Sequence, residues 1–393
     1  MTALPRLEIH TAPASAMPVQ VLDAWAELEE LAPASVYQTR RWLLPWIETV
    51  CPAIGMTPLL VVARDPSGAP LALLPLGISV SGGLRLVQFL GGRDSNANLG
   101  LFRPGFAPPR KHLVAILYQA AVASRLKPDA FLLANQPLTW EGTPNPFAAI
   151  PRQDSPSFCY STALRCDFEP FFKERLSADA RKKMRAKQRK LAEIGPVVHR
   201  KAETEAEVAA FLDAYFEQKQ QRFTQMNISA NLRNDVALDY FRRSCLPAGH
   251  APPAIELHAL KAGERIVAIY GGGIHRGRFH GMINSFDMDP QIARSSPGDL
   301  LLAKLIEEKC REGLTRFDLG IGEGRYKHAW CNEAEPLFDT LIGLTGAGQA
   351  FVFMEKTRRR AKRMIKQSEW AWPMAKKIRA GLRFDKRKED TAP

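Results

Sequence analysis

Three apolar segments between residues 255 and 287 are separated by turns too short to contain a helix. The segments are Ile255 to Leu260, Arg265 to Ile274 and Arg278 to Asp287, and the turns lie at 262–264 and 276–277. Turns this short join antiparallel strands, because neighbouring parallel strands need a crossover of about a dozen residues or more. The sequence therefore predicts an antiparallel meander, which argues against a parallel dinucleotide-binding sheet in this region.

A helix is expected directly after the meander, at Ser296-Pro297-Gly298-Asp299. Ser296 is a suitable N-cap, since its hydroxyl can accept from a first-turn amide, and Asp299 completes a Ser-x-x-Asp capping pattern. Pro297 suits the first helical position, and Gly298 lets a ligand approach the backbone closely. The first-turn amides and the helix dipole favour an anion, and Arg294 adds a cation. The pattern predicts a pyrophosphate site, although any well-capped helix presents the same features.

The order of the expected elements is similar in the two halves of the chain, which at 393 residues is long enough for two domains of about 100–200 residues each. In the half at 1–157 we expect a hairpin (58–64 with 69–80), a strand (84–90), a helix (111–124) and a further strand that starts at 131. In the half at 158–352 we expect two helices (205–222 and 236–245), the meander (255–287), a helix (297–312) and two strands (316–319 and 337–344). The Pro-, Gly- and Ser-rich stretch 135–157 is interpreted as the connection, and 353–393 as a basic helical tail. The expected fold class is α+β (mixed α/β), with tandem halves that are each a mostly antiparallel sheet flanked by helices.

The net charge of +13 is concentrated in two segments. Residues 356–388 contain 14 basic and two acidic side chains, and residues 173–201 contain 11 basic and three acidic ones. The first segment also has Trp and aliphatic side chains, which suits either an interfacial helix on an anionic membrane or a solvated tail. The second is either a solvated helix face or a cationic rim for an anionic ligand. No groove-reading motif accompanies these charges, so a nucleic acid is not expected as a partner.

The cysteines and histidines predict neither a disulfide framework nor a metal site. The six cysteines form no CxxC pair, and no histidine cluster has the spacing of zinc ligands. No apolar run approaches the roughly 20 residues of a membrane span, and no basic stretch followed by an apolar block opens the chain. We therefore expect a cytoplasmic protein, whose basic tail is a candidate for peripheral contact with the inner face of the membrane.

Two segments after the capped helix carry a family resemblance. They are Gly313-Leu-Thr-Arg-Phe-Asp318, and a loop with Gly322 that leads to Tyr326-Lys327-His-Ala-Trp330. With Ser296-Pro297-Gly298-Asp299-Leu-Leu-Leu they resemble the CelD/BioF2-like acetyltransferase group of the GNAT superfamily, which is related to the FemAB peptidyltransferases. The resemblance is specific over residues 165–350 and looser over 55–135. It implies acetyl-CoA or another acyl-CoA as donor, transfer to an amine or less often a hydroxyl, and a first half without the donor site.

Acyl transfer from a thioester needs donors for the developing oxyanion and an acid for the leaving thiolate. The resemblance implies that backbone amides of strand 278–287 polarise the carbonyl. Tyr326 is the first candidate for the acid, and is otherwise a core tyrosine. Asp318 is a candidate base, acceptor-positioning group or loop cap, while Asn284 is a contact for the pantetheine arm or the acceptor, or a core residue. Lys327 is a candidate ligand for a phosphate or carboxylate, or a solvated lysine. Further candidate bases are Glu323, His275 and Asp287. The resemblance also suggests an acceptor-side loop, for which the candidate residues are Gln220, Arg222, Asn231 and Arg233.

The function that these observations favour is transfer of an acyl group, acetyl first, from acyl-CoA to an amine. The acceptor is expected to be a small or envelope-derived molecule, within cell-envelope or exopolysaccharide metabolism. Two alternatives stay open. One is a FemAB-like transferase that uses aminoacyl-tRNA, whose RNA backbone the basic segments would bind. The other is a binding protein that keeps the GNAT shape without the chemistry.

Overall fold

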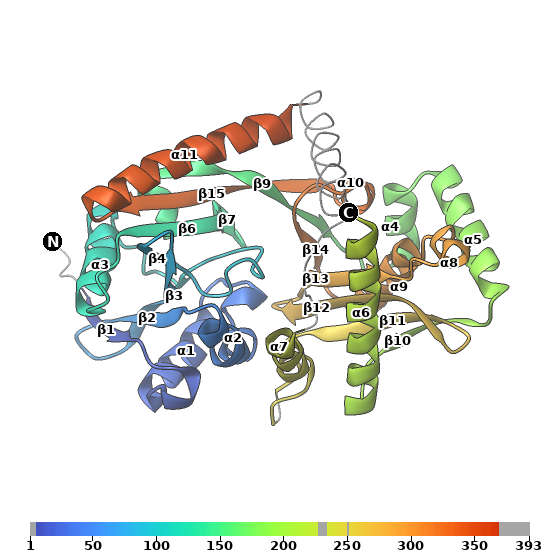
Figure 1. The fold of residues 1–393 in the computed structure, drawn as a ribbon, viewed down its shortest axis with the longest axis horizontal. Helices are drawn as coiled ribbons and strands as arrows, with labels where there is room; N and C mark the ends of the chain where they lie inside the picture. Colours follow the sequence, from blue (N-terminus) through green and yellow to red (C-terminus); the bar gives the residue numbers. More distant parts are fainter. Residues whose placement is uncertain (1–4, 227–233, 250, 369–393) are drawn as a thin grey trace, which may run out of the picture.

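The computed structural model describes residues 5–226, 234–249 and 251–368, and one sheet of 13 strands runs through it (Figure 1). The strand order is β1-β2-β3-β4-β6-β15-β9-β14-β13-β12-β11-β10, and β5 pairs with β3 outside this path. Most neighbours are antiparallel, while β4 with β6 and β13 with β14 are parallel pairs. The expected α+β class with two similar halves is confirmed.

The strands are β1 (Arg6–His10), β2 (Thr57–Arg64), β3 (Pro70–Ser81), β4 (Leu84–Phe89), β5 (Leu101–Phe102), β6 (Ala130–Pro137), β7 (Thr139–Trp140), β8 (Thr143–Pro144), β9 (Arg152–Ala163), β10 (Val197–Lys201), β11 (Glu256–Ala262), β12 (Arg265–His275), β13 (Arg278–Phe286), β14 (Arg316–Ile321) and β15 (Glu333–Gly343). The helices are α1 (Val19–Leu31), α2 (Arg40–Ala53), α3 (Arg110–Ala123), α4 (Phe168–Arg175), α5 (Ala178–Ala192), α6 (Glu205–Gln225), α7 (Asp235–Cys245), α8 (Pro290–Ala293), α9 (Pro297–Arg311), α10 (Arg325–Trp330) and α11 (Gly346–Gln367). Short 3-10 helices are η1 (Ala14–Ala16), η2 (Val36–Gln38) and η3 (Pro146–Ala149).

The two halves repeat one order of elements and exchange their last strands. The series β1, α1, α2, β2, β3, β4, α3, β6 recurs as β10, α6, α7, β11, β12, β13, α9, β14. The next strand in the chain after β6 to join the large sheet is β9, yet it pairs with β14 of the other half. Likewise β15 follows β14 in the chain and pairs with β6. Since β9 and β15 also pair with each other, the exchange makes the two half-sheets continuous.

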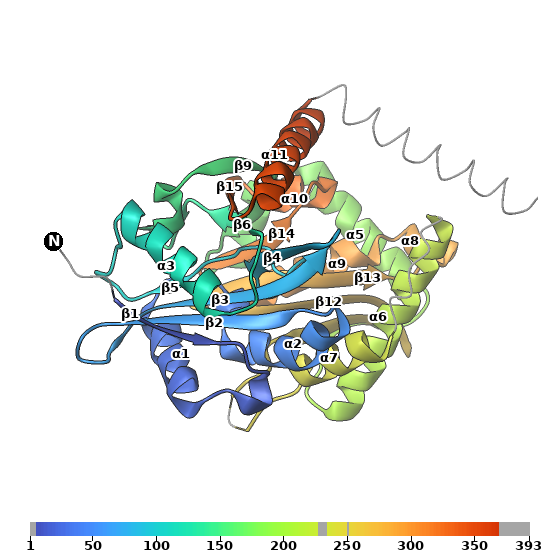
Figure 2. The same cartoon turned by 60° about the vertical axis from the view of Figure 1, so that its left-hand side comes forward.

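Helices cover both faces of the sheet: α1, α2, α7 and α6 follow one another along one face (Figure 2), and α3 packs on the opposite face. Strand β2 shows how the sequence allows this, because successive side chains point to opposite faces. Leu60 and Val62 pack with the tryptophans of α1 and α2, whereas Leu59 and Val61 pack with α3. A strand that is buried on both faces therefore appears in the sequence as a continuous apolar run.

The predicted meander is confirmed as β11, β12 and β13, and the helix after it as α9. The interpretation of 135–157 as a connection is wrong, because this stretch contains β7, β8 and the start of β9. Its turn residues do form turns, but β9 is held by β14 and β15 on its two sides, which composition does not reveal. The proposed boundaries after residues 157 and 352 fall inside β9 and α11, and the division into 1–157, 158–352 and 353–393 stays a proposal.

The basic tail begins within α11, which lies along β15 and β9 (Figure 1). Residues 369–393 of the predicted tail lie outside the described residues. Within the described part of the chain, no helix combines the length and the apolar character needed to cross a bilayer.

Candidate active site

The parallel strands β13 and β14 pair over a short distance and then separate. Arg278–His280 pair with Arg316–Asp318, and beyond these residues the two strands diverge. A cavity of about 190 Å³, here called the fork cavity, has Gly281 and Asn284 of β13 and Ile321 of β14 in its lining. Where the ladder ends, backbone polar groups need other partners. The fork therefore encloses a small cavity inside the sheet.

A second cavity of about 230 Å³, here called the helix cavity, lies at the start of α9. Ser296, Gly298 and Asp299 form its helix side, and Arg222 and Phe286 line it from α6 and β13. The predicted anion site is thus beside a cavity. Three residues line both the fork cavity and the helix cavity: Tyr270, Asn284 and Tyr326. These three residues are called the junction below.

The junction brings together side chains from β12, β13 and α10. Burial raises the pKa of Tyr326 above its usual value, and the neighbouring Asn284 side chain only partly offsets that rise. Burial also raises the pKa of Tyr270 well above its usual value. A Cβ atom at Gly281 would lie 2.6 Å from the Tyr270 hydroxyl oxygen, so glycine makes room for this hydroxyl in the fork. Both tyrosines therefore stay protonated at neutral pH and can donate a hydrogen bond or a proton.

The start of α9 differs from the predicted capping pattern. Ser296 is the N-cap but adopts a left-handed conformation, with φ 49° and ψ 58°, and its side chain caps no amide. The amides of Asp299 and Leu300 donate instead to the backbone oxygen of Ser296, and the Ser296 amide donates to the oxygen of Ala293. The predicted hydroxyl cap and Ser-x-x-Asp box are therefore wrong, because the left-handed backbone turns the serine side chain away from the first turn.

This arrangement leaves the amide of Gly298 as the first-turn donor for a ligand. Among the described residues its N–H has no acceptor, and Pro297 has no N–H to offer. A Cβ atom at Gly298 would meet the Phe286 ring at 3.6 Å, an ordinary contact. Internal packing therefore does not demand glycine here, which supports the expectation that this position keeps the backbone open to a ligand.

The basic segment 173–201 lies against the start of α9. Lys187 of α5 donates from Nζ to the Ser296 hydroxyl at 2.7 Å. Burial raises the pKa of Asp299, and the charges of Lys187 and Arg325 partly offset that rise. Of the two alternatives for this segment, the cationic rim is therefore favoured over a face that only contacts solvent.

Arg294 and Pro297 are not among the residues that line the helix cavity. Arg294 is exposed and donates from Nε to the backbone oxygen of Gln291, 3.1 Å away. Pro297 is buried at the first position of α9, as its fixed φ predicts. Of the six predicted donor-binding residues, Ser296, Gly298 and Asp299 are therefore the ones that the structure brings together at this cavity.

Lys327 and Asp318 support the loop after β14. Lys327 Nζ donates to the backbone oxygens of Gly320 and Ile321 at 3.1 and 2.9 Å, and its side chain lines the fork cavity rather than the helix cavity. The amide of Gly320 donates to Asp318 Oδ1 at 2.6 Å. Asp318 is 1% exposed and lines neither cavity, which favours its loop-cap alternative. Burial acts to raise the pKa of Asp318, but the contact with His280 and the charge of Arg278 outweigh it.

The other candidate bases lie outside both cavities. Glu323 accepts from the Tyr160 hydroxyl at 2.5 Å, and Asp287 accepts from Arg265 Nε at 2.7 Å. His275 ends β12. From the predicted acceptor-side set, Arg222 lines the helix cavity and Gln220 does not. Asn231 and Arg233 lie outside the described residues.

Asn96 reaches the fork from the first half and is not among the site residues predicted from the sequence. Its Nδ2 donates to the Tyr37 hydroxyl at 2.7 Å, and its Oδ1 accepts from the Ile321 amide at 3.5 Å. Gly320 has φ +72°, and a Cβ atom there would lie 2.5 Å from Asn96 Nδ2. No local pattern marks Asn96, because its partners lie far away in the sequence. Tyr270, also missed, has a weak signal as the one hydroxyl-bearing side chain of the apolar segment 266–274.

Residues 178–328 match the family model described as an acetyltransferase (GNAT) domain. FemX has a similar structure, with a TM-score of 0.58 and 9% identity over 86% of this chain and 98% of its own. The C-terminal domain of a protein assigned as a lysylphosphatidylglycerol synthetase from Agrobacterium fabrum has a TM-score of 0.51 and 12% identity, over 86% of this chain and 96% of its own. A conserved protein of unknown function from Bacteroides thetaiotaomicron has a TM-score of 0.52 and 12% identity, over 86% of this chain and 100% of its own. At these identities the likeness is one of fold alone. No curated protein matches the sequence.

Proposed function

We propose that this chain, which has the GNAT acyltransferase fold, is an N-acyltransferase that uses acyl-CoA, with acetyl as the first candidate acyl group. The observation that carries the proposal is the junction, where Tyr270, Asn284 and Tyr326 separate the helix cavity from the fork cavity. One cavity has an anion-binding helix start and a cationic rim. The other is an opening inside the sheet. A donor and an acceptor that enter from opposite sides would meet at three polar side chains.

The helix cavity offers groups that suit a phosphorylated donor. The free amide of Gly298 and the dipole of α9 favour a phosphate oxygen. Lys187 and Arg222 supply positive charge at the same cavity, and Asp299 opposes it. The pantetheine arm would follow β13 toward Asn284, where β13 has separated from β14 and its backbone is free to bond a ligand.

The junction can supply the acid that acyl transfer needs. The amine nitrogen bonds to the thioester carbon, the carbon–sulfur bond breaks, the sulfur gains a proton and the nitrogen loses one. We assign the proton on sulfur to the hydroxyl of Tyr326, which the amine proton then restores through solvent. A free thiol has a pKa near 8.5, and each pKa unit between tyrosine and thiol costs about 1.4 kcal/mol. The raised pKa of Tyr326 therefore favours proton transfer as charge develops on sulfur rather than before.

The proposal extends to the acceptor, which is an amine. Within the superfamily we assign the chain to the CelD/BioF2-like group, acting on a small or envelope-derived amine in cell-envelope or exopolysaccharide metabolism. The fork cavity includes Asn96 from the first half, next to Met282 and Leu319. The first half would then contribute to the choice of acceptor without binding the donor.

We also propose that α11 contacts an anionic membrane surface from the cytoplasmic side. The exposed residues Phe353, Met354, Met364 and Ile365 lie on one side of the helix. At about 3.6 residues per turn, the pair at 364–365 comes three turns after the pair at 353–354 and therefore faces the same way. Basic side chains flank this apolar stripe on both sides: Lys356 and Arg360, and Arg358 and Lys362. On the opposite side of the helix, Arg359 binds Asp339 at 2.6 Å. An apolar stripe between cations is typical of interfacial helices.

Vesicle binding tests the membrane contact. The full chain is expected to sediment with phosphatidylglycerol-containing vesicles, and to release when Phe353 and Met354 are both changed to Ser. Val122→Ser, at another exposed apolar side chain in α3, is the matched control and should have no effect. Equal binding by the double variant and the control would contradict the proposal.

Thermal unfolding with acetyl-CoA tests the donor. At 100 times its Kd a ligand that binds the native state adds about 2.7 kcal/mol to the free energy of unfolding. Longer acyl-CoA chains extend the test, and free CoA released with a panel of amines measures turnover. A FemAB-like enzyme would respond to aminoacyl-tRNA and not to acyl-CoA. Stabilisation without turnover would favour the binding-protein alternative, and no stabilisation by any acyl-CoA would contradict the donor assignment.

A further inference from the structure

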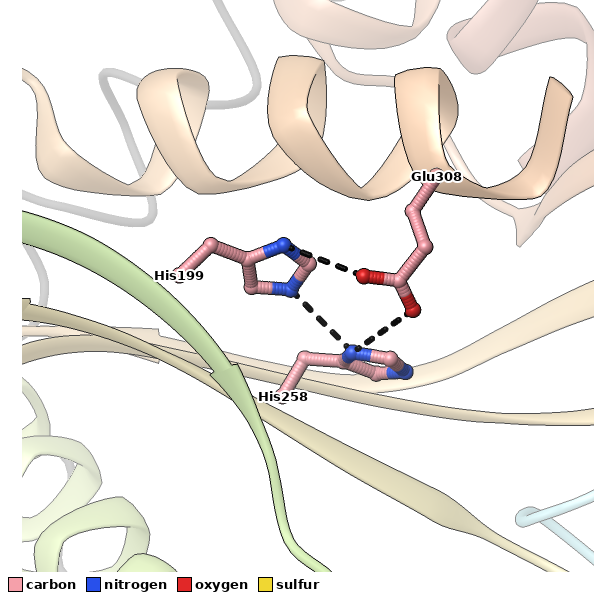
Figure 3. Close-up of side chains that lie close together, drawn as sticks. All are labelled: His199, His258 and Glu308. Carbon is pink, nitrogen blue, oxygen red and sulfur yellow. Dashed lines mark hydrogen bonds and ion pairs between the residues drawn. The ribbon is translucent and has the colours of Figure 1, made fainter. Parts of the chain in front are cut away.

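Two histidines and a glutamate meet between the second half of α9 and the strands β10 and β11, which form one edge of the sheet. Figure 3 shows His199 of β10, His258 of β11 and Glu308 of α9 directed toward one another. His199 Nε2 lies 3.2 Å from His258 Nδ1, and His199 Nδ1 lies 3.3 Å from Glu308 Oε2. The other glutamate oxygen, Oε1, is 3.8 Å from His258 Nδ1. The remaining ring nitrogen of His258 is 3.2 Å from Glu256 Oε2.

The contacts of these groups require one more positive charge than two neutral histidines provide. A carboxylate only accepts, so the proton of His258 must lie on Nε2, facing Glu256. His258 Nδ1 is then a bare acceptor, and a hydrogen bond to it takes the single proton of His199 on Nε2. His199 Nδ1 would then face Glu308 Oε2 with a lone pair on each atom. Either a third proton or a metal cation removes this conflict.

Burial separates these groups from water. His258 is fully buried, and the side chain of His199 is 13% exposed. One ligand atom from each of the three residues lies within 4.8 Å of the others, which is close enough for a single ion to bind all three. Two neutral imidazoles and a carboxylate are the state in which these groups act as metal ligands.

We propose that His199, His258 and Glu308 bind a divalent transition metal, with Zn²⁺ as the best match to this set of ligands. His199 Nε2, His258 Nδ1 and Glu308 Oε1 would be the ligand atoms. His199 then carries its proton on Nδ1 and donates it to Glu308 Oε2, so that every polar atom in the cluster has a partner. Two imidazoles with a carboxylate are an established zinc set.

The geometry of the cluster is compatible with this assignment. Ligand bonds of about 2.0–2.1 Å in a tetrahedral zinc site place neighbouring ligand atoms roughly 3.3 Å apart. The two imidazole nitrogens are 3.2 Å apart, and His258 Nδ1 is 3.8 Å from Glu308 Oε1. The Glu308 side chain is 28% exposed, so a water molecule can reach a fourth position.

The surrounding charges orient the ligands. Glu256 accepts from His258, the carboxylate–histidine pairing that commonly fixes the tautomer of a metal-bound imidazole. Lys309 is fully buried nearby, and its ammonium donates to Glu256 at 2.8 Å and to Glu312 at 2.9 Å. These two carboxylates are the nearest partners of the lysine, whose ammonium is farther, at 3.5 Å, from Glu308 Oε1. The site would tie the edge strand β10 to α9, whose first turn lines the helix cavity. This inference does not depend on the proposed acyl transfer.

Metal analysis of the full chain tests the proposal. After chelation and dialysis, we expect one equivalent of Zn²⁺ to bind per chain, and Co²⁺ to give the visible absorption of a tetrahedral site. His199→Gln, at the partly exposed edge, should abolish stoichiometric binding. Changing Glu256, which accepts from His258, to Gln should weaken the affinity for Zn²⁺ by about 10–100-fold.

Matched controls separate this site from adventitious binding. Glu307→Gln lies one residue away on α9 and pairs with Arg311, and His112→Ala lies in α3 of the other half. Both should bind Zn²⁺ as the parent chain does, and circular dichroism checks that all variants are folded. Absence of stoichiometric Zn²⁺ and Co²⁺ binding, or equal binding by His199→Gln and the controls, would overturn the proposal and leave a cluster that holds a shared proton.

Discussion

Each half of the sheet contains a parallel pair of strands that separates, yet the two openings differ in what occupies them. In the first half, Leu86 and Val87 of β4 pair with Ala130 and Phe131 of β6 before the strands diverge. In the second half, β13 and β14 diverge after three pairs, and the fork cavity lies between them. The backbone plan is therefore the same, and the side chains decide whether the opening is a site or part of the core.

The first fork is filled by apolar rings and a loop. Phe89 and Leu133 belong to a buried cluster with Phe147, and the rings of Phe89 and Phe147 are 6.1 Å apart. Asn98 closes the end of the fork, since its Nδ2 donates to the backbone oxygen of Ala134 at 2.9 Å. The second fork has Gly281, two tyrosines and two asparagines instead. Small and polar residues preserve a cavity where aromatic residues would fill it.

The largest effect is expected at the junction. Tyr326→Phe should lower kcat by about 100- to 1000-fold with little change in the affinity for acyl-CoA, because an acid contributes mainly in the transition state. Because burial raises the pKa of Tyr326, its acid form should persist at neutral pH, and loss of activity from its ionisation should begin only in the strongly alkaline range. Steady-state kinetics against pH measure both effects. Tyr118→Phe on α3 is the control, and unchanged kcat in Tyr326→Phe would remove the proposed acid.

A core truncation in the first fork should act on stability alone. Leu133→Ala removes a fully buried side chain and should lower the free energy of unfolding by about 2–5 kcal/mol. Denaturant unfolding measures the loss, and isothermal titration below the transition should give an acyl-CoA affinity close to that of the parent chain. A Kd that rises in proportion to the lost stability would show that the two forks do not have separate roles.

Closing the approach to the α9 backbone should affect binding without affecting stability. Gly298→Ala places a methyl group in ordinary contact with Phe286 and in the path of a ligand, so we expect a Kd for acyl-CoA about tenfold higher, or roughly 1.4 kcal/mol. Gly346→Ala, in open space at the first turn of α11, is the matched control. Tight binding by the Gly298 variant would mean that the donor lies elsewhere.

The smallest effect is expected from the cationic rim. Lys187→Gln should weaken acyl-CoA binding about two- to fivefold at low salt, and the difference should shrink at high salt because exposed charges are screened. Lys182→Gln, exposed on the same helix, should have a smaller effect. Binding measured at two ionic strengths gives the comparison, and a salt-independent difference would point to a steric role for Lys187.

Sequence patterns predicted the elements that local chemistry specifies. Short glycine turns predicted β11 to β13, and Ser296-Pro297-Gly298-Asp299 predicted the start of α9. The detail of the cap was wrong, because Ser296 has a left-handed backbone and its hydroxyl accepts from Lys187 of a distant helix instead of from a first-turn amide. Asp318 and Lys327 were singled out by position, but their partners are loop backbone groups that the sequence does not identify.

The sequence by itself determined the α+β class, the meander, the helix that begins at Pro297 and the placement of charge in two segments, because periodicity and turn chemistry act over a few residues. Only the tertiary structure decided the exchange of β9 and β15, the entry of Asn96 into the second fork, and the meeting of His199, His258 and Glu308. Each of these joins segments 50 residues or more apart in the printed sequence. Contacts over such separations follow from how the whole sheet packs, and no local pattern of residues encodes them.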